Sequence, residues 1–168
     1  YFLMRLLCLL FCLSLFVACG NPASPSVEET TLPSWSETTT TNSPTARHEA
    51  AFVAVGDKAY LLGGRGIKPV DIFDPATRTW SVGDTSPVEI HHFQPVVYNE
   101  EIYLMGAMTG GYPGETPLPE IHIYSPARDA WRTGATIPES RRRGGAGAVL
   151  HNGLIYMVCG IQDGHRGG

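Results

Sequence analysis

A pattern of two apolar runs around a short polar turn recurs three times in this chain, and it constrains the fold more than any other feature. The three copies read AAFVAVGDKAYLLGG from Ala50, FQPVVYNEEIYLMGA from Phe93 and AGAVLHNGLIYMVCG from Ala146. The turns between the runs are Gly56-Asp57, Asn99-Glu100 and Asn152-Gly153. Such residues favour hairpin turns, which need positive φ at their centre. Each copy therefore predicts a β-hairpin of two adjacent strands.

A second half follows each of the first two hairpins. It reads VDIFDPATRTW after the first and IHIYSPARDAW after the second, and in both an aromatic residue precedes a tryptophan by seven positions. Pro75 and Pro126 stand at the same place in the two segments, where the fixed φ of proline favours a turn. Each complete repeat therefore has four short strands, and the predicted fold class is all-β.

The diglycine Gly63-Gly64, the aromatic residue about ten positions later and the tryptophan seven positions beyond it resemble the Kelch repeat. The second and third repeats depart from this pattern, with Gly106-Ala107 and Cys159-Gly160 in place of the diglycine. The resemblance implies a Kelch-type β-propeller with blades of four antiparallel strands; the alternative is another antiparallel β-repeat architecture. We expect a partial propeller over residues 47–168, with blade 1 at about 47–90, blade 2 at about 91–140 and an incomplete blade 3 at about 141–168.

The second repeat is longer than the first. Tyr60 and Tyr103 are 43 residues apart, whereas Tyr103 and Tyr156 are 53 apart. Eight of the extra residues fall within 108–119, and insertions of this kind map to surface loops of repeat proteins. Tyr112 in this loop is a candidate for stacking on a sugar ring. The alternative is a structural turn that packs on the next blade.

The N-terminus carries an export signal. An uncharged apolar run from Leu6 to Ala18 follows Arg5, and it is too short for a comfortable bilayer span. These are the marks of a secretory signal peptide over residues 1–19; the alternative is an uncleaved anchor helix. Phe16-Val17-Ala18-Cys19 resembles the bacterial lipobox, which implies lipidation of Cys19. We therefore expect an exported cell-envelope lipoprotein, in the periplasm, the outer membrane or at the cell surface.

Residues 20–46 are rich in Ser, Thr and Pro and poor in apolar groups, so they predict a disordered linker between the lipid anchor and the blades. Cys159 is the one remaining cysteine of the mature chain, and its apolar neighbours predict a small buried hydrophobe. A single cysteine excludes an internal disulfide in the mature chain.

Charge and motifs narrow the function. A net charge of −4 argues against a nucleic-acid partner. The chain shows no catalytic constellation and no cofactor motif, so we expect a non-catalytic module that binds glycan or protein, attached to the membrane by its lipid. The alternative is a carbohydrate-active Kelch enzyme, similar to galactose oxidase or to sialic acid mutarotase, whose catalytic residues lie further along the protein.

Cationic side chains recur just before the first strand of each repeat. Besides Tyr112, the candidate ligand-binding residues are therefore Arg47, His48, His91, His92, Arg142 and Arg143. The Kelch resemblance places these positions near one mouth of the central channel, where they would bind an anionic glycan or an acidic peptide. The alternative is that they bind backbone carbonyls or lie in solvated loops.

The histidines give no metal-binding pattern. Adjacent residues of a strand point to opposite faces, so His91 and His92 are expected to point apart. His122 and His165 stand alone, without a second histidine or a cysteine at ligand spacing. The sequence therefore predicts no metal site.

Overall fold

The computed structural model describes residues 34–166, and the unit that begins at Glu37 contains every strand discussed below. The predicted signal peptide, Cys19 and most of the predicted linker lie outside these residues. Among residues 34–166, no helix is long and apolar enough to cross a bilayer.

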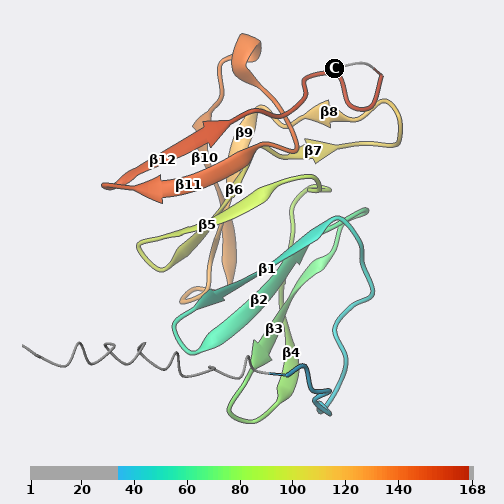
Figure 1. Cartoon of the computed structure of the whole chain (residues 1–168), viewed down its shortest axis with the longest axis vertical. Helices are drawn as coiled ribbons and strands as arrows, with labels where there is room; N and C mark the ends of the chain where they lie inside the picture. The colour runs from blue at the N-terminus through green and yellow to red at the C-terminus, as the bar shows by residue number, and fades with distance from the viewer. Residues whose placement is uncertain (1–33, 167–168) are drawn as a thin grey trace, which may run out of the picture. The chain divides into compact units, whose positions relative to one another are not determined.

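Two antiparallel sheets of four strands correspond to the first two repeats (Figure 1). The first has the order β1 (Ala50–Val55), β2 (Lys58–Gly63), β3 (Pro69–Asp74) and β4 (Thr79–Thr85). The second has the order β5 (Gln94–Tyr98), β6 (Glu101–Met105), β9 (Glu120–Ser125) and β10 (Ala130–Thr136). A short 3-10 helix (Glu139–Arg141) follows the second sheet. The predicted all-β fold with four-stranded blades is confirmed.

The third repeat and the insertion each form a two-stranded sheet. The third repeat contributes the hairpin of β11 (Gly147–His151) and β12 (Leu154–Val158). The insertion is a smaller hairpin of β7 (Met108–Thr109) and β8 (Thr116–Pro117), with its loop between them. Both hairpins lie where the repeat spacing predicts them.

Turn chemistry sets the three main hairpins. Gly56, Asn99 and Asn152 are equivalent in the repeat and have φ of +61°, +49° and +49°. Glycine and asparagine tolerate this left-handed conformation, which matches the twist of the paired strands. The strands then pair directly across each turn, for example Val55 with Lys58. The hairpin is therefore encoded locally, by the turn residues.

The core lies between the first two blades. Leu62, Ile102, Leu104 and Tyr124 are at most 1 % exposed and belong to one apolar cluster. The Tyr124 hydroxyl donates to Asp129 Oδ1 at 2.6 Å, and the same oxygen accepts the backbone N–H of Asp84 in β4. This shared carboxylate ties the two blades together. The first strands also meet, because β5 contacts both β1 and β11 (Figure 1).

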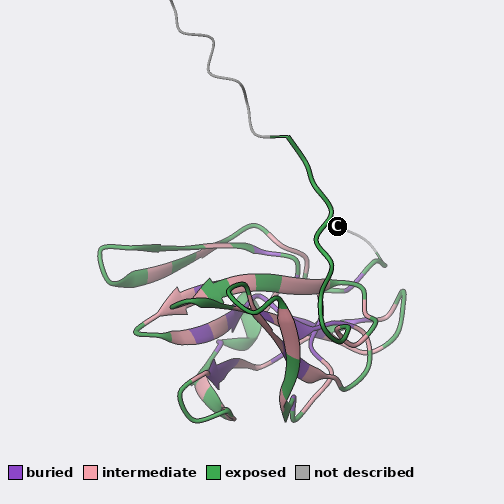
Figure 2. Cartoon of the chain, turned by 90° about the horizontal axis from the view of Figure 1, so that it is seen from below, coloured by how far each residue is buried: buried purple, intermediate pink, exposed green. Residues whose placement is uncertain are grey.

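The β11–β12 hairpin is the least buried part of the repeat region (Figure 2). Val149, Leu154 and Val158 are each about 60 % exposed. Cys159, which the sequence predicts to be buried, is exposed. That prediction is wrong because Cys159 follows the end of β12, on a hairpin that no outer strand covers within residues 34–166.

The last part of the predicted linker packs on blade 1. Thr41 forms a parallel bridge to Thr79, with backbone hydrogen bonds to Arg78 and Trp80 of 2.9 and 3.0 Å. Thr45 donates both its backbone N–H and its hydroxyl to the buried carboxylate of Asp71. The expected linker boundary at residue 46 is therefore too late, because polar contacts order this segment where apolar content did not predict order.

Candidate functional site

A residue one or two positions before the first strand of each repeat is left-handed. Glu49, His92 and Gly145 have φ of +57°, +50° and +62°, and they are separated by the same 43 and 53 residues as the repeated tyrosines. They are therefore equivalent positions of successive repeats. Because the first strands lie side by side, equivalent side chains converge: Glu49 Oε2 is 3.4 Å from His92 Nδ1.

His91 and His92 point toward each other, not apart. Their Nδ1 atoms are 2.7 Å apart. The expected alternation fails because His92 has left-handed backbone and is not part of a strand. His91 is fully buried; its backbone pairs with Met108, and its Nε2 lies 3.0 Å from the carbonyl oxygen of Gly110.

Arg65 and Glu115 extend this cluster across three repeats. Arg65 follows β2, and its guanidinium contacts Glu49 Oε2 at 2.7 Å and Glu115 Oε1 at 2.6 Å. Glu115 belongs to the insertion of the second repeat, and its side chain is fully buried. His165, which follows β12 in the third repeat, places Nδ1 3.2 Å from the same carboxylate.

The electrostatics of the cluster are set by its carboxylates. The hydrogen bond from Arg65 lowers the pKa of Glu115 to about 2. Glu89 accepts the backbone N–H groups of Gly66 and Gly110, which lowers its pKa too. Burial lowers the pKa of His91 and favours its neutral form.

The carboxylates of Glu49, Glu89 and Glu115 lie around the guanidinium of Arg65, and Arg166 adds a second cation on the side of Glu115. The end of the blades that carries this cluster therefore favours binding of a cation. The sequence had led us to expect an anion there, because of the histidines. The His48 side chain is 72 % exposed, and its Nδ1 lies 3.7 Å from Glu49 Oε1.

Arg47 and Arg143 have the same role in the first and third repeats. Arg47 Nε and Nη1 donate to the carbonyls of Thr45 and Gly63 at 3.2 and 2.9 Å. Arg143 Nε and Nη1 donate to the equivalent carbonyls of Arg141 and Cys159 at 3.1 and 3.0 Å. Arg47 also binds Asp71, and its side chain is only 2 % exposed. Both arginines thus bind backbone carbonyls, which is the alternative considered for them above.

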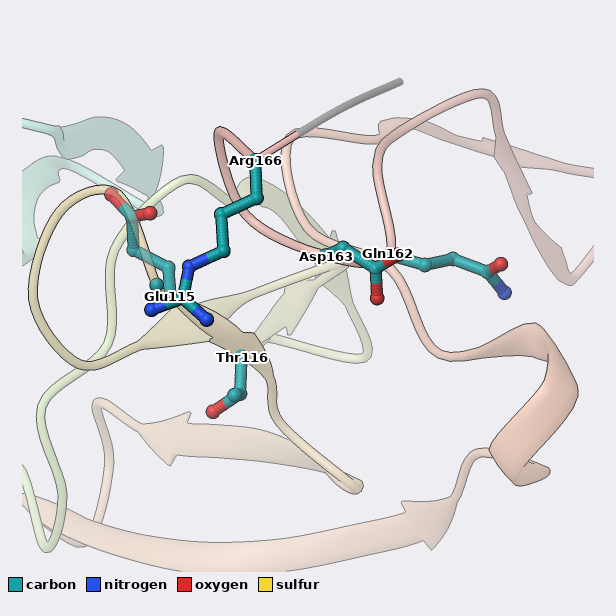
Figure 3. A pocket seen from close by; sticks show the side chains of 6 residues that line it. Glu115, Thr116, Gln162, Asp163 and Arg166 are labelled. Atoms are coloured by element: carbon teal, nitrogen blue, oxygen red, sulfur yellow. The ribbon is translucent and has the colours of Figure 1, made fainter.

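Arg142 also donates its Nε to a backbone carbonyl, that of Ile137 at 3.1 Å, and in addition it lines one of two adjoining polar pockets. One pocket, of about 300 Å³, lies between the insertion and the segment after β12, and Arg166 reaches across it over Gly114 toward Glu115 (Figure 3). The other, of about 380 Å³, lies beside the 3-10 helix. Thr116, Gln162 and Asp163 line both pockets.

Tyr112 is 73 % exposed and packs beside His165, with ring centres 5.3 Å apart.

The sequence alone did not indicate Glu49, Arg65 or Glu115. Glu49 could have been found, because the 43-residue spacing makes it the equivalent of His92. Arg65 and Glu115 are 50 residues apart and meet only through folding, so the local sequence carries no signal for them.

Four-stranded antiparallel blades whose first strands lie together are the repeat unit of a β-propeller. No protein-family model matches the chain. Over 129 residues it is 30 % identical to Kelch-like protein terF of Aspergillus terreus, covering 68 % of this chain and 27 % of the relative. It is also 28 % identical over 115 residues to an F-box/kelch-repeat protein of Arabidopsis thaliana, covering 66 % and 24 %.

A human relative, Kelch repeat and BTB domain-containing protein 12, is 29 % identical over 136 residues, covering 69 % of this chain and 22 % of its own length. Together with the observed sheets, these similarities show that the blades are of Kelch type. The chain spans about a quarter of the length of the curated relatives it matches.

Proposed function

We propose that this chain is part of an exported, lipid-anchored Kelch propeller that acts as a non-catalytic binding module, with a glycan as its ligand. The pair of adjoining polar pockets between the insertion and the third repeat carries this proposal. At about 300 and 380 Å³ they are at the small end of ligand sites and suit one or two sugar units. The similarity to Kelch-repeat proteins supports the binding-module role.

The chemistry of the lining favours a hydroxylated ligand. Thr116 and Gln162 offer both donors and acceptors, and Asp163 offers a carboxylate that accepts from sugar hydroxyls. Arg142 adds a cationic donor in the larger pocket, beside the carboxylates of Glu139 and Asp163, so sugar hydroxyls meet charged donors and acceptors there. Thr116 begins the short strand β8, and Arg142, Gln162 and Asp163 lie on loops, where binding residues commonly occur.

A glycan array probed with the full-length protein tests the ligand class, with acidic peptides on the same surface as the competing protein-like ligands. We expect binding to glycans, weakened roughly 10- to 100-fold by Arg142→Ala or Asp163→Ala because a charge-assisted contact is lost. Lys58→Ala is the matched control, since Lys58 is exposed at the far hairpin turn. Binding only to peptides, or binding unaffected by both pocket substitutions, would contradict the proposal.

Anchoring is tested separately. The apolar run that ends at Val17-Ala18-Cys19 supports lipidation of Cys19. In a bacterium grown with labelled palmitate, the wild-type protein should carry label in the membrane fraction and Cys19→Ala should not. Equal labelling of both proteins would refute the anchor and leave the glycan proposal standing.

A further inference from the structure

We propose that Glu49, His91 and His92 form a binding site for a divalent first-row transition-metal ion, and that zinc is the ion this ligand set favours. Each residue offers one donor atom, and the three atoms lie within 4.8 Å of one another. Imidazole nitrogen and carboxylate oxygen are both common zinc ligands. The site is separate from the polar pockets, which none of the three residues lines.

The distances suit one small ion. Zinc lies about 2.0–2.1 Å from nitrogen and oxygen ligands, so tetrahedral donors stand roughly 3.3 Å apart. Glu49 Oε2 is 3.4 Å from His92 Nδ1 and 3.7 Å from His91 Nδ1. The two Nδ1 atoms are 2.7 Å apart, so binding needs them to separate by about 0.6 Å. His92 is partly exposed and can make that adjustment.

The tautomer of His91 is set for metal binding. Its Nε2 lies 3.0 Å from the Gly110 carbonyl, which can only accept, so Nε2 carries the proton. Neutral His91 therefore directs the Nδ1 lone pair at His92 and Glu49. A ring N–H donated to a backbone carbonyl is the usual outer support of a metal-bound histidine.

The short contact between the two histidines requires a hydrogen atom or a metal ion between the two nitrogens. Two Nδ1 lone pairs 2.7 Å apart repel unless a proton or a metal ion is shared. Without metal, His92 donates its Nδ1 proton to His91. When metal binds, His92 carries its proton on Nε2 instead, so neutral His92 keeps one proton and both Nδ1 atoms become ligands.

The surrounding charges stabilise a bound cation. Arg65 donates to Glu49 Oε2 and fixes the carboxylate beside the histidines. Its positive charge is offset by Glu115, with which it forms a second ion pair, and by the nearby carboxylate of Glu89. Three protein ligands leave one position of a tetrahedral zinc for water or an external ligand. Glu49 and His92 are 28 % and 23 % exposed, so that position is reachable from solvent.

Cobalt titration of the full-length protein, prepared without a histidine tag and stripped with a chelator, tests the site. We expect one equivalent of Co²⁺ to give a saturable visible absorption band, which one equivalent of Zn²⁺ abolishes. Glu49→Gln and His92→Asn, both at partly exposed side chains, should each weaken Zn²⁺ binding at least tenfold. His151→Asn, in the β11 hairpin, is the matched control and should bind like wild type.

X-ray absorption of the zinc-loaded wild-type protein gives a readout that needs no variant: two imidazole nitrogens should be among the atoms bound to zinc. The proposal is overturned by wild-type protein that shows no saturable binding, by a spectrum without imidazole ligands, or by Glu49→Gln and His92→Asn proteins that bind as tightly as His151→Asn.

Discussion

Blades 1 and 2 share one strand arrangement but differ in what they bury at two equivalent positions. In blade 1 the pair is Arg47 and Asp71, and the aspartate is 1 % exposed. In blade 2 the equivalents are Ile90 and His122, since Asp71 pairs with Leu61 of β2 exactly where His122 pairs with Leu104 of β6. One blade thus buries a salt bridge where the other buries an isoleucine and a histidine.

This difference shows that the blade backbone does not depend on one particular buried pair. Asp71 accepts hydrogen bonds from Arg47 and from Thr45, so its charge is well compensated. Ile90 joins the apolar cluster instead. His122 Nδ1 is buried without a hydrogen-bond partner among the described residues. The turns and the apolar runs are the features that both blades share.

The largest effect is expected from Arg47→Ile, which gives blade 1 the residue of blade 2. It leaves the Asp71 carboxylate buried with only its Thr45 donors, and breaking such a pair costs about 3–5 kcal/mol. Urea denaturation of the full-length protein measures this loss in the free energy of unfolding.

The double variant Arg47→Ile with Asp71→His sharpens the test, because it rebuilds the blade 2 pair in blade 1. It should be more stable than Arg47→Ile alone, since no charge is left unpaired. If the double variant instead loses as much free energy of unfolding as Arg47→Ile and Asp71→His lose together, the two blades are not interchangeable at these positions.

A smaller effect, in the opposite direction, is expected from His122→Leu. It removes a buried nitrogen without a partner, so the free energy of unfolding should rise by about 1 kcal/mol. The gain should depend on pH. Burial lowers the pKa of His122 below its ordinary 6.5, so as pH falls through 6.5 the unfolded chain takes up a proton that the folded chain does not.

The wild type therefore loses stability on acidification, and His122→Leu should lose less. Unfolding curves at about pH 7.5 and pH 5.5 measure how much the free energy of unfolding changes with pH in the wild type and in His122→Leu. His151→Leu is a control at a histidine in an exposed position of β11. If the free energy of unfolding changes equally with pH in the wild type and in His122→Leu, this histidine does not contribute to the pH dependence of stability.

The smallest effect concerns the third hairpin. Cys159 has φ of +60°, where its equivalents are Gly63 and Gly106. A non-glycine residue in the left-handed conformation destabilises the folded state by about 1–2 kcal/mol. Glycine avoids this strain, but its more flexible unfolded chain offsets about half of the gain in stability. Cys159→Gly should therefore raise the free energy of unfolding by about 0.5 kcal/mol, measured by urea denaturation.

The reverse change, Gly106→Cys, is the matched contrast. A Cβ at Gly106 would lie 2.6 Å from Ala146 Cβ, so this substitution should destabilise the protein by more than Cys159→Gly stabilises it. A neutral result at both positions would mean that the left-handed residue after the second strand is not a shared requirement of the repeats.

The hairpins, the four-stranded repeat and the position of the insertion could all be predicted from the sequence. Each of these depends on local chemistry: a glycine or asparagine with positive φ at the turn, apolar runs on both sides, and a fixed spacing between an aromatic residue and a tryptophan. Such signals are complete within about twenty residues. The resemblance to the Kelch repeat, which these signals carry, implied that the residues before the first strands would lie together.

The roles of those residues, by contrast, depend on contacts that form only in the folded protein. Arg47 binds carbonyls and Asp71 within its own blade, whereas His91 and His92 face each other and Glu49. Glu115 enters this cluster from the insertion and meets Arg65, 50 residues away in the chain. Side-chain partners of this kind depend on burial and on distances between separate repeats, which no local pattern records.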